Sequence, residues 1–191
     1  VTGPSLGGTR EFVMRLLACE EGEGLILVTT DRASPEVIES FEGGGGAYDT
    51  ARMAVVDCTA DSRAHAEHNV HAVSGPSDLT GIGIAFSSLY EELYAGGVER
   101  VRTGLYTLAP LLMFVDEVQP LYRFLHTVTG RIRSAGGLGV AAIDPETQDE
   151  TTIRTLSQPF DGEIRLREAD GYEMRIRGLD GQPEGWQQLD L

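Results

Sequence analysis

The first ten residues constrain the fold of this chain more than any other stretch. They read Val-Thr-Gly-Pro-Ser-Leu-Gly-Gly-Thr-Arg, and an apolar run with helical spacing begins directly afterwards, at Phe12. A glycine-rich turn that opens into a helix gathers backbone N–H groups around one point, and the helix N-terminus adds partial positive charge there. The sequence therefore predicts a phosphate cradle that includes Gly3, Ser5, Gly7 and Gly8.

The glycine spacing matches a nucleotide-binding motif, but two of the motif's working positions differ. The pattern Gly3-x4-Gly8 has the frame of the P-loop, G-x-x-x-x-G-K-[ST]. Thr9 stands where the lysine should reach the terminal phosphates, and Arg10 stands where a hydroxyl should bind Mg²⁺. We include both among the nucleotide-binding candidates and interpret the stretch as a relic or a site that binds without turnover. A plain glycine-rich turn is the alternative, because lone glycine motifs have many false positives.

The charged residues exclude several classes of function. All 15 basic residues are arginine, and the 30 acidic residues bring the net charge to −15. The lack of lysine excludes both a P-loop lysine and Schiff-base chemistry. The acidic excess argues against a nucleic-acid-binding protein, which needs a basic surface. Such a composition is typical of proteins adapted to high salt.

The length of 191 residues predicts one domain over 1–191. Only Val1 and Thr2 precede the glycine turn, so we expect a first strand that is cut short at the N-terminus. No apolar run approaches the ~20 residues that span a bilayer, and no signal peptide is visible. Cys19 and Cys58 are expected to be buried thiols in a reducing compartment, which predicts a cytoplasmic protein without membrane contact.

Strands and helices alternate along the sequence, and a hairpin pattern ends it. Expected strands are 25–29, 53–58, 70–73, 98–105 and 138–144; expected helices are 11–18, 35–41, 77–95, 118–134 and 151–157; the hairpin strands are 163–168 and 172–177. This order predicts an α/β fold with a mostly parallel, doubly wound sheet and a C-terminal antiparallel hairpin.

Asp31 is the single candidate for a catalytic residue. It follows the strand at 25–29, and ligands of open α/β sheets bind at the carboxyl ends of the strands. The alternative is that Asp31 or Ser34 caps the helix that begins at Pro35, and the local sequence favours the cap.

Three of the four histidines, His65, His68 and His71, lie close together. Their i, i+3, i+6 spacing would place them along one helical face, and imidazole is a common metal ligand. However, 70–73 has the pattern of a strand, which would break that register, and no cysteine accompanies them at zinc-finger spacing. We therefore predict an exposed polar loop and no metal site.

As a set, five segments resemble the KaiC-like branch of the RecA-type P-loop ATPases, and within it a divergent family of halophilic archaea. The segments are 3–8, 28–32, 77–84, 104–112 and 122–126. The resemblance implies a RecA-like three-layer fold over nearly the whole chain. It also implies ATP with Mg²⁺ as the one candidate cofactor, bound at the glycine loop, and self-association or binding of protein partners.

The chain departs from that family at three functional positions. Thr9 replaces the loop lysine, Arg32 replaces the second acid of the pair that begins with Asp31, and Tyr106 replaces the magnesium-binding Asp. Loss of one electrostatic donor slows such reactions by ~100- to 1000-fold, so we predict a non-hydrolysing regulatory or assembly protein. One alternative is a nucleotide-binding switch or slow ATPase in which Arg10 replaces the lysine. Another is an unrelated α/β enzyme that uses Asp31, Asp144 or the histidines.

Overall fold

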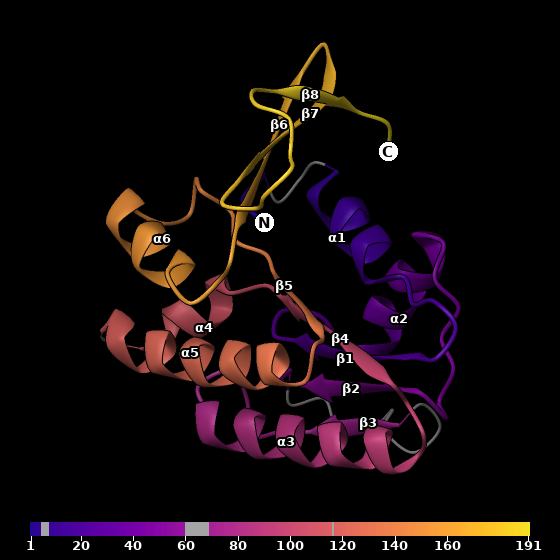
Figure 1. The fold of residues 1–191 in the computed structure, drawn as a ribbon. Coiled ribbons are helices and arrows are strands. Elements are labelled where there is room, and N and C mark those ends of the chain that lie inside the picture. The colour runs from indigo at the N-terminus through magenta and orange to yellow at the C-terminus, as the bar shows by residue number, and fades with distance from the viewer. Residues whose placement is uncertain (5–7, 60–68, 116) are drawn as a thin grey trace.

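A five-stranded parallel sheet with the strand order β3-β2-β1-β4-β5 forms the centre of the structure (Figure 1). The structure is a computed structural model that describes residues 1–4, 8–59, 69–115 and 117–191. The strands are β1 (Glu23–Thr29), β2 (Met53–Asp57), β3 (Val70–Ala72), β4 (Arg100–Tyr106) and β5 (Leu138–Ala141). Every residue of β1 and β2 is buried, as expected for continuous apolar strands that are covered on both faces.

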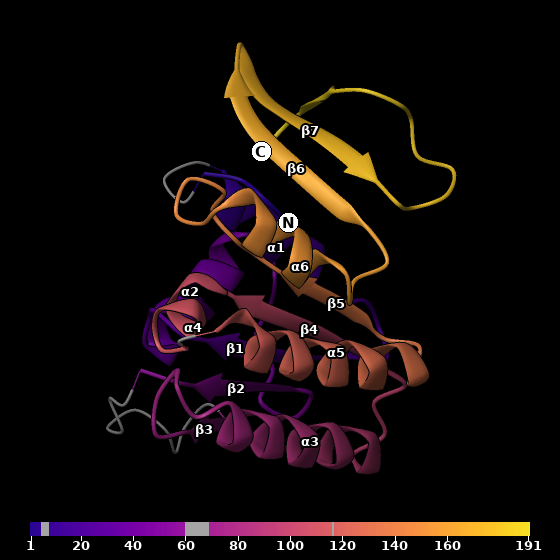
Figure 2. The ribbon, with the colours of Figure 1, turned by 90° about the vertical axis from the view of Figure 1, so that its left-hand side faces the viewer.

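Helices cover both faces of this sheet and make a three-layer fold (Figures 1 and 2). One face packs against α1 (Thr9–Leu17) and α2 (Ser34–Gly43). The other face packs against the remaining helices, α3 (Leu79–Ala95), α4 (Ala109–Met113), α5 (Val118–Ser134) and α6 (Glu150–Ser157). Each side has its own buried apolar cluster, so the sheet separates two cores.

The C-terminal part of the chain forms a second, three-stranded antiparallel sheet. Its strands are β6 (Glu163–Ala169), β7 (Gly171–Arg177) and β8 (Gln187–Leu189), in that order across the sheet. The β6–β7 turn needs a residue with positive φ, which Gly171 supplies at φ 107°. The predicted hairpin is therefore confirmed, whereas β8 and the short helix α4 were not expected.

The opening residues join the two sheets. Thr2 makes parallel bridges to Ile143, just beyond β5, and to Arg165 in β6. Figure 1 accordingly shows the N-terminus between β5 and β6. Ser5 and Gly7 of the glycine-rich stretch lie outside the described part, and α1 begins at Thr9. The described residues thus have an extended segment before that stretch and a helix after it.

Candidate functional site

The glycine-rich turn and the start of α1 define the site that the sequence predicts. The amide of Phe12 donates the first helical hydrogen bond to the carbonyl of Gly8 (2.8 Å). A Cβ atom at Gly3 would overlap the hydroxyl of Thr9, and one at Gly8 would overlap the side chain of Leu191. At both described glycines, the group that lies close to the backbone is a side chain of the protein itself.

Thr9, at the position of the P-loop lysine, faces the protein interior. Its side chain is only 5% exposed, and its Oγ1 has no hydrogen-bond partner among the described residues. The hydroxyl packs against the backbone of Gly3. A short, uncharged side chain in this position cannot extend to the terminal phosphates of a nucleotide.

Arg10 turns towards the end of β4. Its Nε lies 3.4 Å from the hydroxyl of Tyr106, and its guanidinium carbon is 5.2 Å from the centre of the Tyr106 ring. Tyr106 itself is 4% exposed. The two side chains form a cation–π pair at the strand end where the resemblance expects a magnesium-binding acid.

Asp31 lies exposed just beyond β1, and it does not cap α2. The N-cap residue of α2 is Ala33, which has no side-chain cap, so the prediction that Asp31 or Ser34 caps this helix is wrong. Desolvation raises the pKa of Asp31, and the positive charges of Arg10 and Arg32 partly oppose that rise. The catalytic role of Asp31 stays a prediction.

Asp57, which the sequence analysis missed, supplies the acceptor at the start of α2. It ends β2, is 1% exposed, and accepts hydrogen bonds from the amide of Ser34 (2.8 Å) and from the amide and hydroxyl of Thr59 (2.8 and 2.6 Å). Burial would raise the pKa of Asp57, but these hydrogen bonds outweigh burial and hold the pKa below its usual range. In the sequence, Asp57 directly follows the apolar run 53–56. An acid in that position, at the end of a buried strand, could have identified Asp57 as a structural acceptor.

Threonines hold the adjacent ends of β1 and β4 together. The Thr30 hydroxyl donates to the carbonyl of Thr107 (2.7 Å), and the Thr107 amide lies 3.1 Å from the same hydroxyl. The Thr29 hydroxyl donates to the carbonyl of Arg32 (2.6 Å). These contacts position the segment that carries Asp31 beside the Arg10–Tyr106 pair.

The C-terminal residues cover the start of α1. Leu191 and the ring of Tyr172 both lie against Gly8, and Arg15 of α1 donates to the carbonyl of Asp190 (3.0 Å). An isobutyl group over the first helical turn offers no charge to an anion. With Thr9 turned inward and Tyr106 at the strand end, the described residues do not fit a magnesium–triphosphate complex.

The other predicted candidates are described only in part. His71 lies in β3, while His65 and His68 lie outside the described residues. Asp144 follows Ile143, whose carbonyl accepts a hydrogen bond from the Gly3 amide (3.3 Å), and its own side chain accepts one from the amide of Glu146 (2.9 Å). Within the described ranges, no group of three histidine, cysteine or acidic residues could hold a metal ion.

The thiols of Cys19 and Cys58 are not activated as nucleophiles. Burial raises the pKa of Cys19 to about 11 and that of Cys58 to about 12. Cys58 is buried, as predicted, while Cys19 is only partly buried. Neither has the lowered pKa of a nucleophilic cysteine. No described helix is long and apolar enough to cross a membrane.

Comparison with known proteins identifies the family and the fold. Residues 1–166 match a family of unknown function, DUF7504, and the chain belongs to that family. The crystal structure of the KaiC-like protein PH0186 from the hyperthermophilic archaeon Pyrococcus horikoshii OT3 is similar, with a TM-score of 0.64 and 14% identity. The match covers 97% of this chain and 81% of that chain. A search of curated protein sequences found no match.

At this identity the likeness shows the fold alone. It confirms the prediction of an α/β, KaiC-like fold with a parallel sheet between helices and a C-terminal antiparallel hairpin. The halophilic branch of the resemblance stays a prediction, and so do the nucleotide-binding residues.

Proposed function

We propose that this chain is a P-loop-fold protein that does not hydrolyse nucleotide and acts as a regulatory or assembly protein through contacts with other proteins or with copies of itself. The observation that carries the proposal is the Arg10–Tyr106 pair at the end of β4. An aromatic ring held under a guanidinium offers no oxygen ligand of the kind that Mg²⁺ requires.

The surroundings of the glycine turn support the same function. Phosphoryl transfer depends on positioned positive charge and a metal ion, because the protein contributes little covalent chemistry. Thr9 supplies no charge, and the apolar side chain of Leu191 lies against Gly8 at the start of α1. Each missing electrostatic group would lower turnover by ~100- to 1000-fold.

A phosphate-release assay with ATP and Mg²⁺, run at low salt and in multi-molar KCl, tests the proposal. We expect no turnover above a blank without protein. Asp31→Asn is the matched control, because it removes the one acid of the family's pair that is present. Turnover by the unmodified chain that Asp31→Asn abolishes would overturn the proposal.

A nucleotide-binding switch or slow ATPase is the second candidate, and the placement of Arg10 favours it. The guanidinium lies at the strand ends, close enough to Asp31 that its positive charge partly opposes the rise in pKa that burial causes there. A nucleotide that displaced it from the Tyr106 ring would gain a positive charge. A melting temperature that rises with the concentration of ATP and Mg²⁺, and rises less in Arg10→Gln, would support this candidate.

A further inference from the structure

Arginines gather on one face of the C-terminal hairpin, in a chain whose net charge is −15. The register of β6 against β7 places Arg165 opposite Arg175, and Arg167 and Arg177 follow two residues later on their strands, so they point to the same side. We call this surface the arginine face and define it by these four residues. Four of the 15 basic residues of the chain therefore lie on one side of a single hairpin.

The arginine face points away from α1. The other side of the same strands carries Leu166, which lies beside Gly3, and Tyr172, whose ring lies against Gly8. Successive side chains of a strand point to opposite sides, so the arginines are turned away from the glycine turn. Three of the four are exposed, and Arg175 is partly buried. Figures 1 and 2 both show this hairpin extending beyond the helices that cover the main sheet.

The acids of the same face do not balance its charge. Glu163 pairs with Arg165 (3.0 Å), and Glu173 pairs with Arg167 (2.6 Å). Among the described residues, the other two arginines of the face form no ion pair. The register also sets Arg165 directly opposite Arg175, and like charges in directly opposite positions destabilise a sheet. Anionic groups from outside the hairpin would relieve this repulsion.

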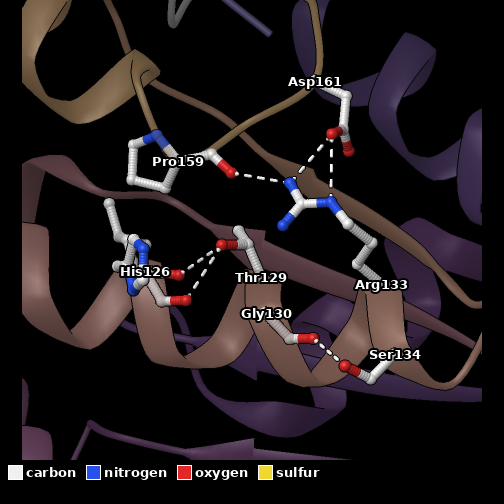
Figure 3. A network of polar contacts seen from close by, with 8 residues as sticks. His126, Thr129, Gly130, Arg133, Ser134, Pro159 and Asp161 are labelled. Carbon is white, nitrogen blue, oxygen red and sulfur yellow. Dashed lines mark hydrogen bonds and ion pairs between the residues drawn. The ribbon is translucent and has the colours of Figure 1, made fainter.

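Two arginines elsewhere in the chain show the contrast with a structural role. Figure 3 shows Arg133 of α5, whose Nη2 contacts the Asp161 carboxylate (2.8 Å) and the Pro159 carbonyl (3.2 Å) in the segment before β6. Arg102 of β4 contacts Glu23 of β1 (2.6 Å). Each of these contacts fastens two elements of the fold together. The two ion pairs of the arginine face stay within the hairpin, so they do not serve that purpose.

An aromatic ring holds one of the four arginines in place. The guanidinium carbon of Arg167 lies 4.0 Å from the centre of the Trp186 ring, which is the geometry of a cation–π contact. A guanidinium that is already stacked loses less conformational freedom when it binds a carboxylate. Arginine and tryptophan are also the residues that most often dominate the binding energy of protein interfaces.

The outer side of α2 carries complementary charges. It exposes three acids at intervals of three residues, Glu36, Glu39 and Glu42, which we call the α2 acids. Among the described residues, only Glu36 of these three has an ion-pair partner, Arg32 at 3.5 Å. The helix packs on the same face of the main sheet as α1, from which the arginine face points away. The two surfaces therefore cannot meet within one chain, but they can meet between two.

We propose that the arginine face docks on the α2 acids of a second copy of this chain, so that copies join head to tail. The inference rests on the proposed function, in which self-association is one form of assembly, and it names the two surfaces. The fork of a guanidinium matches a carboxylate and binds it through two hydrogen bonds. Because the two surfaces differ, every added copy leaves one of each free, and the assembly can close into a ring or continue as a filament.

Sedimentation velocity of the full chain without nucleotide tests the proposal. Arg175→Gln with Arg177→Gln should weaken self-association at least tenfold, and so should Glu39→Gln with Glu42→Gln. An equimolar mixture of these two double variants should form a dimer and nothing larger, because only one intact arginine face can meet one intact set of α2 acids. A chain with all four charges exchanged, glutamate for both arginines and arginine for both glutamates, should associate again.

Arg123→Gln with Arg154→Gln is the matched control, because it removes two exposed arginines from other surfaces. It should leave association unchanged, and melting curves check that every variant folds. Association of the unmodified chain should weaken at least threefold between ~0.1 and ~1 M KCl, since the screening length falls from ~10 to ~3 Å.

A chain that stays monomeric at low salt would overturn the proposal, and so would equal losses in the control or a charge-exchanged chain that stays monomeric. If the monomeric chain binds a labelled oligoglutamate or a single-stranded oligonucleotide through the arginine face, the occupant is another acidic protein or a nucleic acid, which also overturns it. The phosphate-release assay remains separate: turnover would contradict the proposed function, whereas a monomer would contradict only the docking.

Discussion

The glycine-turn site and the β5–β6 slot, a cavity between β5 and β6 with walls from α5 and α6, lie at opposite ends of the same opening segment, and they differ in what fills them. At the first, Leu191 lies on Gly8, and Arg10 lies on Tyr106. At the second, apolar walls and two strand edges surround a cavity of about 440 Å³. The region whose sequence suggests a ligand is covered by the chain's own side chains, whereas the region without any motif encloses a cavity.

The largest expected effect sharpens this comparison through two leucines, one in α5 and one in α6, that pack on the same side of the sheet. Leu125 is fully buried in the core cluster, whereas Leu156 is 2% exposed but also lines the slot. Leu125→Ala should lower the free energy of unfolding by about 4 kcal/mol, and Leu156→Ala by about 2 kcal/mol, because Leu156 already borders empty space and makes fewer contacts. Urea unfolding of both variants measures the difference, and equal losses would mean that the slot is closed.

Substitution of Asp57 tests whether backbone donors near the ends of β1 and β2 depend on an acceptor from the chain itself. Asp57→Ala should lower the free energy of unfolding by about 2–4 kcal/mol, because it leaves the donors of Ser34 and Thr59 without their buried acceptor. Asp57→Asn, which keeps an acceptor oxygen, should lose about 1 kcal/mol. If Asp57→Ala unfolds at the same urea concentration as the unmodified chain, these hydrogen bonds do not stabilise the fold.

The lowered pKa of Asp57 predicts that the stability of the fold depends on pH. The pKa of Asp57 is lower in the folded chain than in an unfolded chain, where an aspartate titrates at about 3.9. Its contribution to stability is therefore fully present above about pH 4 and is lost as the pH falls through the folded-state pKa. Asp57→Asn should lose less stability than the unmodified chain between pH 5 and the acid transition, and parallel curves would contradict this assignment.

Leu191→Ala tests the cover over the glycine turn. Leu191 is partly exposed, so its truncation should lower stability by only about 1 kcal/mol. Hydrogen exchange at the amides of Thr9 and Arg10 should become faster, because water then reaches the first turn of α1. Leu179→Ala is the control, since Leu179 lies at the slot and not at the turn. Unchanged exchange at Thr9 and Arg10 would show that Leu191 does not shield them.

The smallest expected effect concerns the ion pair beside the slot. Arg133 and Asp161 are about half and two-thirds exposed, so Arg133→Gln should lower stability by at most about 1 kcal/mol. Arg154→Gln, which breaks the more exposed pair with Glu150, is the control and should have almost no effect. A loss above ~2 kcal/mol in Arg133→Gln would show that this contact stabilises the fold more than an exposed ion pair does.

Local patterns in the sequence determined most of the secondary structure. The expected helix at 118–134 coincides with α5, because its apolar residues repeat with helical spacing. Asp78 caps α3, since its side chain accepts from the amide of Gly81, three residues away (2.7 Å). The alternation that predicts β6 and β7 is equally local. Each of these signals lies within a few neighbouring residues.

Only the tertiary structure decided what surrounds the glycine turn and the slot. Arg15 and Asp190 are 175 positions apart, and Asp57 and Ser34 are 23 apart, so their pairing leaves no periodic signal in the sequence. The prediction that Asp31 or Ser34 caps α2 is wrong for that reason: a buried acid on the neighbouring strand accepts the helical amide instead. The slot likewise exists only because β5 and β6, which are distant in sequence, line one cavity without pairing.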